Sequence, residues 1–132
     1  MGRSLKAAAL AGCMLLVASV APAAAKCGTA DFKGVWVYGS SGGQICLVEG
    51  DRAGAIRNSR CYSGDLREDL GPVHGKVRIS SGCRVSATVT QRYQGKVYKF
   101  RLSGTLDRSG ERIRGTGKGE AGTFGFDLTK QW

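Results

Sequence analysis

Cysteine is the residue type in this chain whose spacing points to a definite chemistry. The chain holds five cysteines: Cys13, Cys27, Cys46, Cys61 and Cys83. Cys13 lies in an apolar N-terminal stretch, which leaves an even number in residues 26–132. An even count in a small chain indicates disulfides if that chain reaches an oxidising compartment. No Cys-x-x-Cys pair is present and the gaps are long, so a metal site is not expected.

Four cysteines can pair in three ways. Cys46 and Cys61 flank one predicted hairpin, which favours a bond between them and leaves Cys27 to pair with Cys83. A disulfide in a small domain typically adds about 2–4 kcal/mol of stability.

The other candidate chemistry is acid–base catalysis. His74 is the only histidine, and Asp65, Glu68 and Asp69 precede it in a loop-like segment. A catalytic triad needs a nucleophile, a base and an orienting group in contact, and no nucleophile-elbow motif marks a serine for that role. We therefore expect no enzyme, no cofactor and no metal, with His74 as a surface or packing residue.

The N-terminus has the order of a secretory signal. Arg3 and Lys6 precede an uncharged run from Ala7 to Val20, and Ala23–Ala25 supplies small residues for cleavage before Lys26. The apolar run is shorter than the roughly 20 residues that span a bilayer. We expect a signal peptide over residues 1–25 and a single periplasmic or secreted domain over residues 26–132, without a transmembrane segment.

A second interpretation of the N-terminus remains open. Leu10-Ala11-Gly12-Cys13 resembles a bacterial lipoprotein cleavage box, which would anchor the chain through a lipid on Cys13. The most apolar stretch, Met14 to Val20, follows that box, and this favours a continuous signal sequence with Cys13 inside it.

Alternation of apolar and polar residues dominates residues 26–132 and predicts strands. The expected strands lie near Phe32–Tyr38, Gln44–Glu49, Ala53–Arg57, Val77–Ile79, Cys83–Thr90, Tyr98–Leu102, Arg112–Gly117 and Thr123–Thr129. Short turns between them favour an antiparallel meander of about eight strands. Such a meander closes into a small barrel without exposed edges. A two-sheet sandwich is the alternative.

These strands position two sets of candidate site residues. Trp36, Phe100, Phe124 and Phe126 are expected inside the barrel, where they either fill the core or line a ligand pocket. Arg78, Arg84, Lys99, Arg101, Arg112 and Arg114 are expected on wet faces, as a candidate anion-binding stripe. Residues 26–132 carry 18 Lys and Arg against 10 Asp and Glu, a net charge of +8 (18 − 10) that favours anionic partners.

The sequence Gly34-Val35-Trp36 in the first predicted strand resembles that of calycin-like secreted barrels, which include lipocalins, avidins and bacterial metalloprotease inhibitors. Gly42-Gly43-Gln44-Ile45-Cys46 looks most like the inhibitor branch, in which a second-strand cysteine is bonded to a later one; Cys61 is the counterpart here. The resemblance implies a barrel whose Trp36 closes one end, and an N-terminal strand that enters a protease cleft. A tether at Cys27 conflicts with that mechanism.

Together these patterns predict an exported, non-enzymatic barrel that acts by binding. The resemblance makes protease inhibition its most concrete form, with an exported protease as partner. The alternatives are a basic protein that docks on an anionic envelope component and a small-ligand carrier. Nucleic acid is not expected as a partner, because export separates the protein from the nucleic acid of the cell. In addition, no exposed aromatics interleave with the cations.

Overall fold

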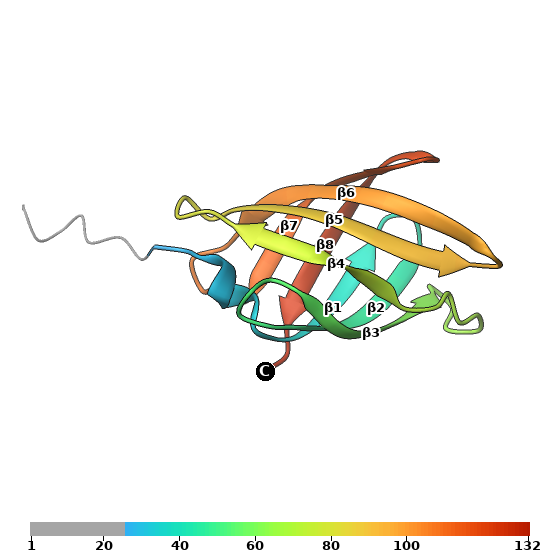
Figure 1. The fold of residues 1–132 in the computed structure, drawn as a ribbon, viewed down its shortest axis with the longest axis horizontal. Helices are drawn as coiled ribbons and strands as arrows, with labels where there is room; N and C mark the ends of the chain where they lie inside the picture. Colours follow the sequence, from blue (N-terminus) through green and yellow to red (C-terminus); the bar gives the residue numbers. More distant parts are fainter. Residues whose placement is uncertain (1–25) are drawn as a thin grey trace, which may run out of the picture.

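The computed structural model describes residues 26–132, which form an antiparallel barrel of eight strands (Figure 1). A 3-10 helix, η1 (Thr29–Phe32), comes first. The strands are β1 (Gly34–Ser40), β2 (Gln44–Gly50), β3 (Ile56–Ser63), β4 (Val73–Ile79), β5 (Arg84–Tyr93), β6 (Lys96–Leu106), β7 (Arg112–Gly119) and β8 (Gly122–Lys130). The predicted signal peptide and Cys13 lie outside the described residues.

The strand order shows how the sheet curls into a barrel. Neighbours in the sheet run β3-β2-β1-β8-β7-β6-β5-β4. Strands that follow each other along the chain are therefore paired, except β3 and β4 at the two ends of this order, and β1 also pairs with β8. The β1–β8 register runs from Trp36 opposite Lys130 to Ser40 opposite Phe126, and it pairs the first strand with the last. The prediction of an eight-stranded antiparallel barrel is confirmed, and the sandwich is not adopted.

The barrel is nearly closed, with one irregular seam between β3 and β4. Two isolated bridges, Ala55 with Lys76 and Tyr62 with Asp69, stand there in place of a continuous ladder. The side chain of Ser59 replaces a backbone partner: its hydroxyl accepts a hydrogen bond from the Val73 N–H and donates one to the Val73 carbonyl, both at 2.8 Å. The seam is therefore bonded, but more sparsely than the other strand pairs.

Side-chain alternation explains why these segments become barrel strands. In β5, Val85, Ala87 and Val89 are buried, whereas Ser86 and Thr88 between them are exposed. A strand with this pattern gains free energy only when one face is covered by apolar neighbours. All eight strands satisfy that requirement together by turning their apolar faces toward one shared interior.

Both disulfides predicted from the sequence are confirmed. Cys46 and Cys61 lie directly opposite each other in the β2–β3 register, 15 residues apart in sequence. Cys27 and Cys83 are 56 residues apart, and their bond attaches the segment before η1 to the turn between β4 and β5. Two disulfides suggest folding in an oxidising compartment, extracellular or periplasmic.

Within residues 26–132, no helix has the length and hydropathy required to span a membrane.

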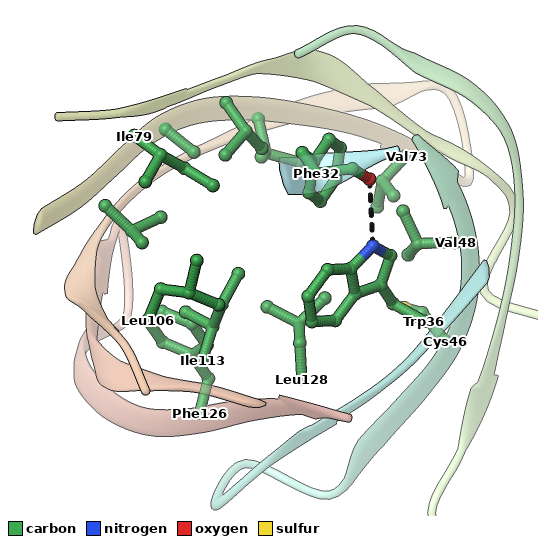
Figure 2. Close-up of a cluster of buried hydrophobic side chains, with 14 of the residues drawn as sticks. Phe32, Trp36, Cys46, Val48, Val73, Ile79, Leu106, Ile113, Phe126 and Leu128 are labelled. Carbon is green, nitrogen blue, oxygen red and sulfur yellow. Dashed lines mark hydrogen bonds between the residues drawn. The ribbon is translucent and has the colours of Figure 1, made fainter. Parts of the chain in front are cut away.

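Helix η1 and Trp36 close one end of the barrel (Figure 2). Phe32 and Trp36 stack with ring centroids 5.9 Å apart and are 1% and 0% exposed. The indole N–H of Trp36 donates a hydrogen bond of 2.9 Å to the carbonyl oxygen of Phe32. Thr29 attaches η1 to β4, because its hydroxyl accepts a hydrogen bond of 3.1 Å from the Ile79 N–H. The Lys130 ammonium lies 5.6 Å from the centre of the Trp36 ring.

Replacement of Trp36 by phenylalanine should destabilise the barrel strongly. Trp36→Phe removes buried volume and leaves the Phe32 carbonyl without its donor, so we expect the free energy of unfolding to fall by about 2–4 kcal/mol. Trp132→Phe is the matched control, because Trp132 is 77% exposed at the C-terminus. Urea denaturation of both variants measures the difference, and equal losses would contradict this role of Trp36.

The two disulfides should differ in their accessibility to reductant. Cys46 and Cys61 are 2% and 0% exposed, whereas Cys27 and Cys83 are partly exposed. Because exchange requires a thiolate to reach a sulfur atom, we expect a mild thiol reductant to open the Cys27–Cys83 bond first. Alkylation of the freed thiols and peptide mass spectrometry give the order. Earlier release of Cys46 and Cys61 from folded protein would disprove it.

Candidate functional site

The interior of the barrel is hollow on the far side of Trp36. A cavity of about 350 Å³ extends from Phe32 and Ile113 toward the opposite end of the barrel. There it reaches exposed residues of two turns, Gly42 between β1 and β2 and Ala121 between β7 and β8. One end of the barrel is thus closed by η1, and the cavity opens at the other.

Apolar side chains from all eight strands make up most of the cavity wall. They are Tyr38, Cys46, Val48, Ile56, Val73, Val77, Val85, Ala87, Val89, Phe100, Leu102, Ile113, Phe124, Phe126 and Leu128. Among the predicted core residues, Trp36 and Phe126 are buried, while Phe100 and Phe124 are half-buried and line the cavity. The aromatic residues therefore fill one end of the barrel and line the other.

Glycines in β7 explain why the aromatic rings leave the lumen free. A Cβ atom on Gly117 would collide with the Phe124 ring, and one on Gly119 would lie 2.7 Å from the Phe100 ring. The two rings therefore lie over bare β7 backbone and meet edge to face, with centroids 5.9 Å apart. Because β7 contributes backbone where a side chain would otherwise stand, the rings are held against the wall.

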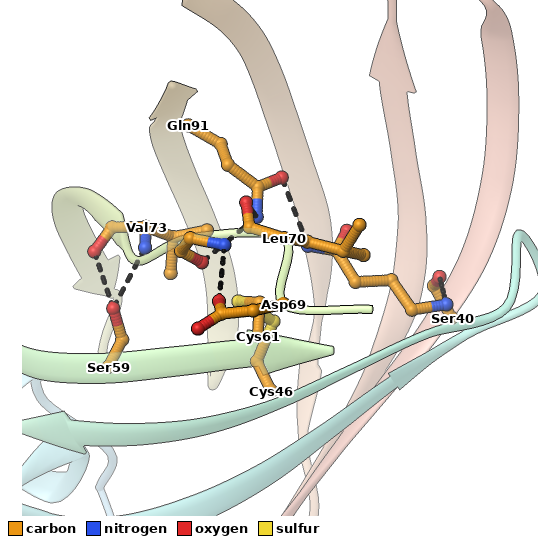
Figure 3. Close-up of a disulfide and its surroundings, with 10 residues drawn as sticks. Ser40, Cys46, Ser59, Cys61, Asp69, Leu70, Val73 and Gln91 are labelled. Carbon is orange, nitrogen blue, oxygen red and sulfur yellow. Dashed lines mark hydrogen bonds between the residues drawn. A yellow bond between two sulfur atoms is a disulfide. The ribbon is translucent and has the colours of Figure 1, made fainter. Parts of the chain in front are cut away.

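Polar groups gather on one side of the cavity, where β1 and β2 meet the loop before β4 (Figure 3). The Gln44 side-chain amide donates a hydrogen bond of 3.0 Å to the Gln91 carbonyl oxygen. The Gln91 amide in turn donates to the backbone carbonyls of Leu70 (3.1 Å) and Gly71 (3.3 Å). Gln91 is only 6% exposed, and these bonds satisfy it. The Ser40 hydroxyl accepts a hydrogen bond from the Gln44 N–H at 3.3 Å.

The groups that a cavity ligand could reach are polar but uncharged. Tyr38, Ser40, Gln44 and Thr123 line the cavity, and no Lys, Arg, Asp, Glu or His does so within the described residues. Burial raises the pKa of the Tyr38 hydroxyl to about 12, against a smaller opposing effect of its hydrogen bond with Ser40. Burial thus disfavours negative charge at this wall.

A second recess of about 490 Å³ lies along the β3–β4 seam and is lined in part by Asn58, Arg60, Asp69 and His74. His74 is exposed on β4, and its register partner in β5 is Thr90. No hydrogen bond joins the His74 side chain to another group in the part of the chain that the structure describes. The Ser59 hydroxyl, which also lines the recess, is hydrogen-bonded to the Val73 backbone.

The acidic loop residues are engaged with their own loop. Asp65 accepts a hydrogen bond of 2.6 Å from the Ser63 hydroxyl and one of 3.1 Å from the Arg67 N–H, and the first of these is the main cause that lowers the Asp65 pKa. Asp69 accepts from the Gly71 N–H at 2.8 Å. Among residues 26–132, no group of three or more His, Cys, Asp or Glu side chains is arranged to hold a metal ion.

The predicted anion-binding residues come from four adjacent strands on the outside of the barrel. They are Arg78 on β4, Arg84 on β5, Lys99 and Arg101 on β6, and Arg112 and Arg114 on β7. Arg112 differs from the others because its guanidinium lies 3.1 Å from the Asp127 carboxylate. The structure thus groups these residues on one side and places none of them in the cavity wall.

The sequence did not reveal the polar cluster formed by cavity-lining residues and Gln91 behind them. Tyr38, Ser40, Gln44 and Gln91 come from three strands, and their sequence neighbourhoods carry no motif. The one available signal was Gln91, a polar residue at a position where the alternation of β5 requires an inward apolar side chain.

No protein-family model matches the chain, and no curated protein matches it. Among solved structures, the chain is similar to a redesigned β-barrel, mFAP1, bound to DFHBI, with a TM-score of 0.56 and 14% sequence identity. The match covers 78% of this chain and 97% of that chain. At this identity the likeness shows a shared barrel fold, and it does not extend to the bacterial inhibitor branch suggested by the Gly34-Val35-Trp36 segment.

Proposed function

We propose that the barrel binds a small, neutral and largely apolar molecule in its interior cavity. The observation that carries the proposal is a cavity of about 350 Å³ that reaches exposed turns at one end and has an uncharged lining. Pockets for small molecules are concave, mostly apolar, about 300–1,000 Å³ in volume, and contain a few placed polar groups. The cavity has each of these properties.

The composition of the wall supports a ligand without charge. An anion in the cavity would lose its hydration and meet no cation, because the Lys and Arg side chains of the β4–β7 strands lie outside the lumen. A cation would find no carboxylate among the lining residues. A neutral molecule with one hydrogen-bonding group would instead bury apolar surface against Val89 and Phe124 and reach Tyr38 or Gln44.

The similar solved barrel adds limited support. The redesigned β-barrel mFAP1 is bound to DFHBI, so a protein of this general fold accommodates a small molecule. This supports the class of function, small-molecule binding, and leaves the identity of the ligand to experiment.

Protease inhibition has less support. Cys27 is bonded to Cys83, the Cys27 N–H donates to the Ser81 carbonyl at 3.4 Å, and the next residues form η1 at the closed end of the barrel. A segment held in this way cannot extend into a protease cleft from Cys27 onward. Protease inhibition would be supported only if the protein caused a tight, stoichiometric loss of a protease's activity.

A pair of fluorescent probes tests the proposal. N-phenyl-1-naphthylamine is neutral, and 1-anilinonaphthalene-8-sulfonate has a closely related skeleton with a negative charge. We expect the neutral probe to bind the oxidised protein with a strong rise in emission, and Ala87→Phe to reduce that binding at least about tenfold by filling the cavity. Emission of the anionic probe should not depend on residue 87. Fluorescence titration measures both.

The control for that test is Ala53→Phe, the same substitution on an exposed turn between β2 and β3. If Ala87→Phe does not fold, Val89→Phe offers a second substitution on the same wall. Equal binding of the neutral probe by the cavity variant and the Ala53→Phe control would rule out the cavity as its site.

A further inference from the structure

Strands β4 to β7 contain no Asp or Glu but ten Lys and Arg. The ten are Lys76, Arg78, Arg84, Arg92, Lys96, Lys99, Arg101, Arg112, Arg114 and Lys118. The rest of residues 26–132 holds 8 Lys and Arg (18 − 10) and all 10 Asp and Glu, a net charge of −2. Four adjacent strands therefore carry +10 while the remainder of the barrel is slightly negative.

This distribution differs from what solubility alone requires. Charges that only keep a protein soluble work when both signs are mixed over the surface, but here four adjacent strands carry cations and no acid. We call the outer surface of β4–β7 the cationic face. Its members are nine of the ten residues named above, because Lys96 lies on the same side of β6 as the cavity-lining Phe100.

Strand register arranges the cations in rows across the barrel. One row runs from Lys76 on β4 past Thr88 on β5 to Arg101 on β6 and Lys118 on β7. All four residues are exposed. Adjacent strands lie about 4.8 Å apart, so the row is about 15 Å wide.

A second row lies nearer the closed end of the barrel and contains Arg84, Thr105 and Arg114. Like the first row, it interleaves cations with a hydroxyl side chain and contains no acid. The cationic face thus extends in two dimensions, across four strands and along them.

Few of these charges are neutralised by the protein. Ion pairs involve Lys96, which lies 3.0 Å from Glu120, and Arg112, which lies 3.1 Å from Asp127. Asp127 is also the register partner of Arg114. Each acid lies beyond the four strands, at the β7–β8 turn or on β8. Within the described residues, no other ion pair reaches the cationic face.

We propose that the cationic face docks the barrel on an anionic phospholipid bilayer. A bilayer presents a broad, fluid field of phosphates, which matches cations spread over four strands and needs no groove. A linear polyanion would need a groove lined by cations, and no cation of this face lines either recess of the barrel. Nucleobases would need exposed aromatics among the cations, whereas the residues between them are mostly Ser and Thr.

One exposed apolar residue fits a membrane surface as well. Val97 is 53% exposed on β6, opposite Arg92 in the β5–β6 register and two residues before Lys99. An apolar side chain surrounded by cations can enter the boundary between lipid headgroups and acyl chains while the charges meet phosphates. The proposal does not depend on a ligand in the cavity.

Sedimentation with lipid vesicles tests the proposal. The vesicles contain phosphatidylcholine alone, or phosphatidylcholine with about one third phosphatidylglycerol, at salt of about 0.05 M and about 0.5 M. We expect binding that requires phosphatidylglycerol and is lost at the higher salt. All proteins carry the same residues 1–25, so any binding by that segment cancels when variants are compared.

Two matched triple variants locate the surface that binds. Lys99→Glu, Arg101→Glu and Lys118→Glu reverse three charges on the cationic face; Arg52→Glu, Arg60→Glu and Arg108→Glu reverse three exposed cations elsewhere. Net charge changes equally in both. The face variant should lose at least about tenfold in phosphatidylglycerol-dependent partitioning, and the control should change by less than about threefold. Glutamine replacements at the same positions serve if a glutamate variant does not fold.

Three results would overturn the proposal. One is an equal loss in both triple variants, which would show that net charge alone matters. Another is binding that phosphatidylglycerol does not increase. The third is binding to a soluble sulfated polysaccharide at a salt concentration where anionic vesicles leave the protein in the supernatant, because that would assign the face to a linear polyanion.

Discussion

The hydrogen bond from the Trp36 indole to the Phe32 carbonyl decides which end of the barrel is closed. It holds η1 across the lumen, where Phe32 stacks on Trp36 and both are removed from water. The Cys27–Cys83 bond and the Thr29–Ile79 hydrogen bonds keep the same segment in place. With that end filled, the remaining interior is a cavity that opens only toward the turns at the other end, and its lining determines what can bind.

Much of the fold could be predicted because it depends on local pattern. Alternation located the strands, and the hairpin argument gave the Cys46–Cys61 pair. The third strand was misplaced: Ala53–Arg57 was expected, and β3 is Ile56–Ser63, because a register irregularity at Glu49–Gly50 and a turn through Asp51 delay the return of the chain. Apolar and polar residues alternate only weakly from Arg57 to Ser63, so the sequence pattern did not predict a strand there.

The hollow interior could not be predicted, since it depends on how side chains from different strands pack. Phe100 and Phe124 would fill the lumen if β7 carried side chains beneath them; Gly117 and Gly119 let the rings lie against the wall. The hydrogen bond between Gln44 and Gln91 joins residues 47 positions apart. The positions of the cations on the outside were easier to anticipate, because strand alternation alone places them there.

The barrel has an uncharged interior and a strongly cationic outer face, and we propose a different ligand for each. A crystal structure of the protein grown with N-phenyl-1-naphthylamine would show whether the interior is a ligand site. We expect the probe between Tyr38, Ala87 and Phe124, with η1 and Trp36 undisplaced. A probe found only on the outer surface, or a lumen filled by the protein's own side chains, would contradict a ligand site in the interior.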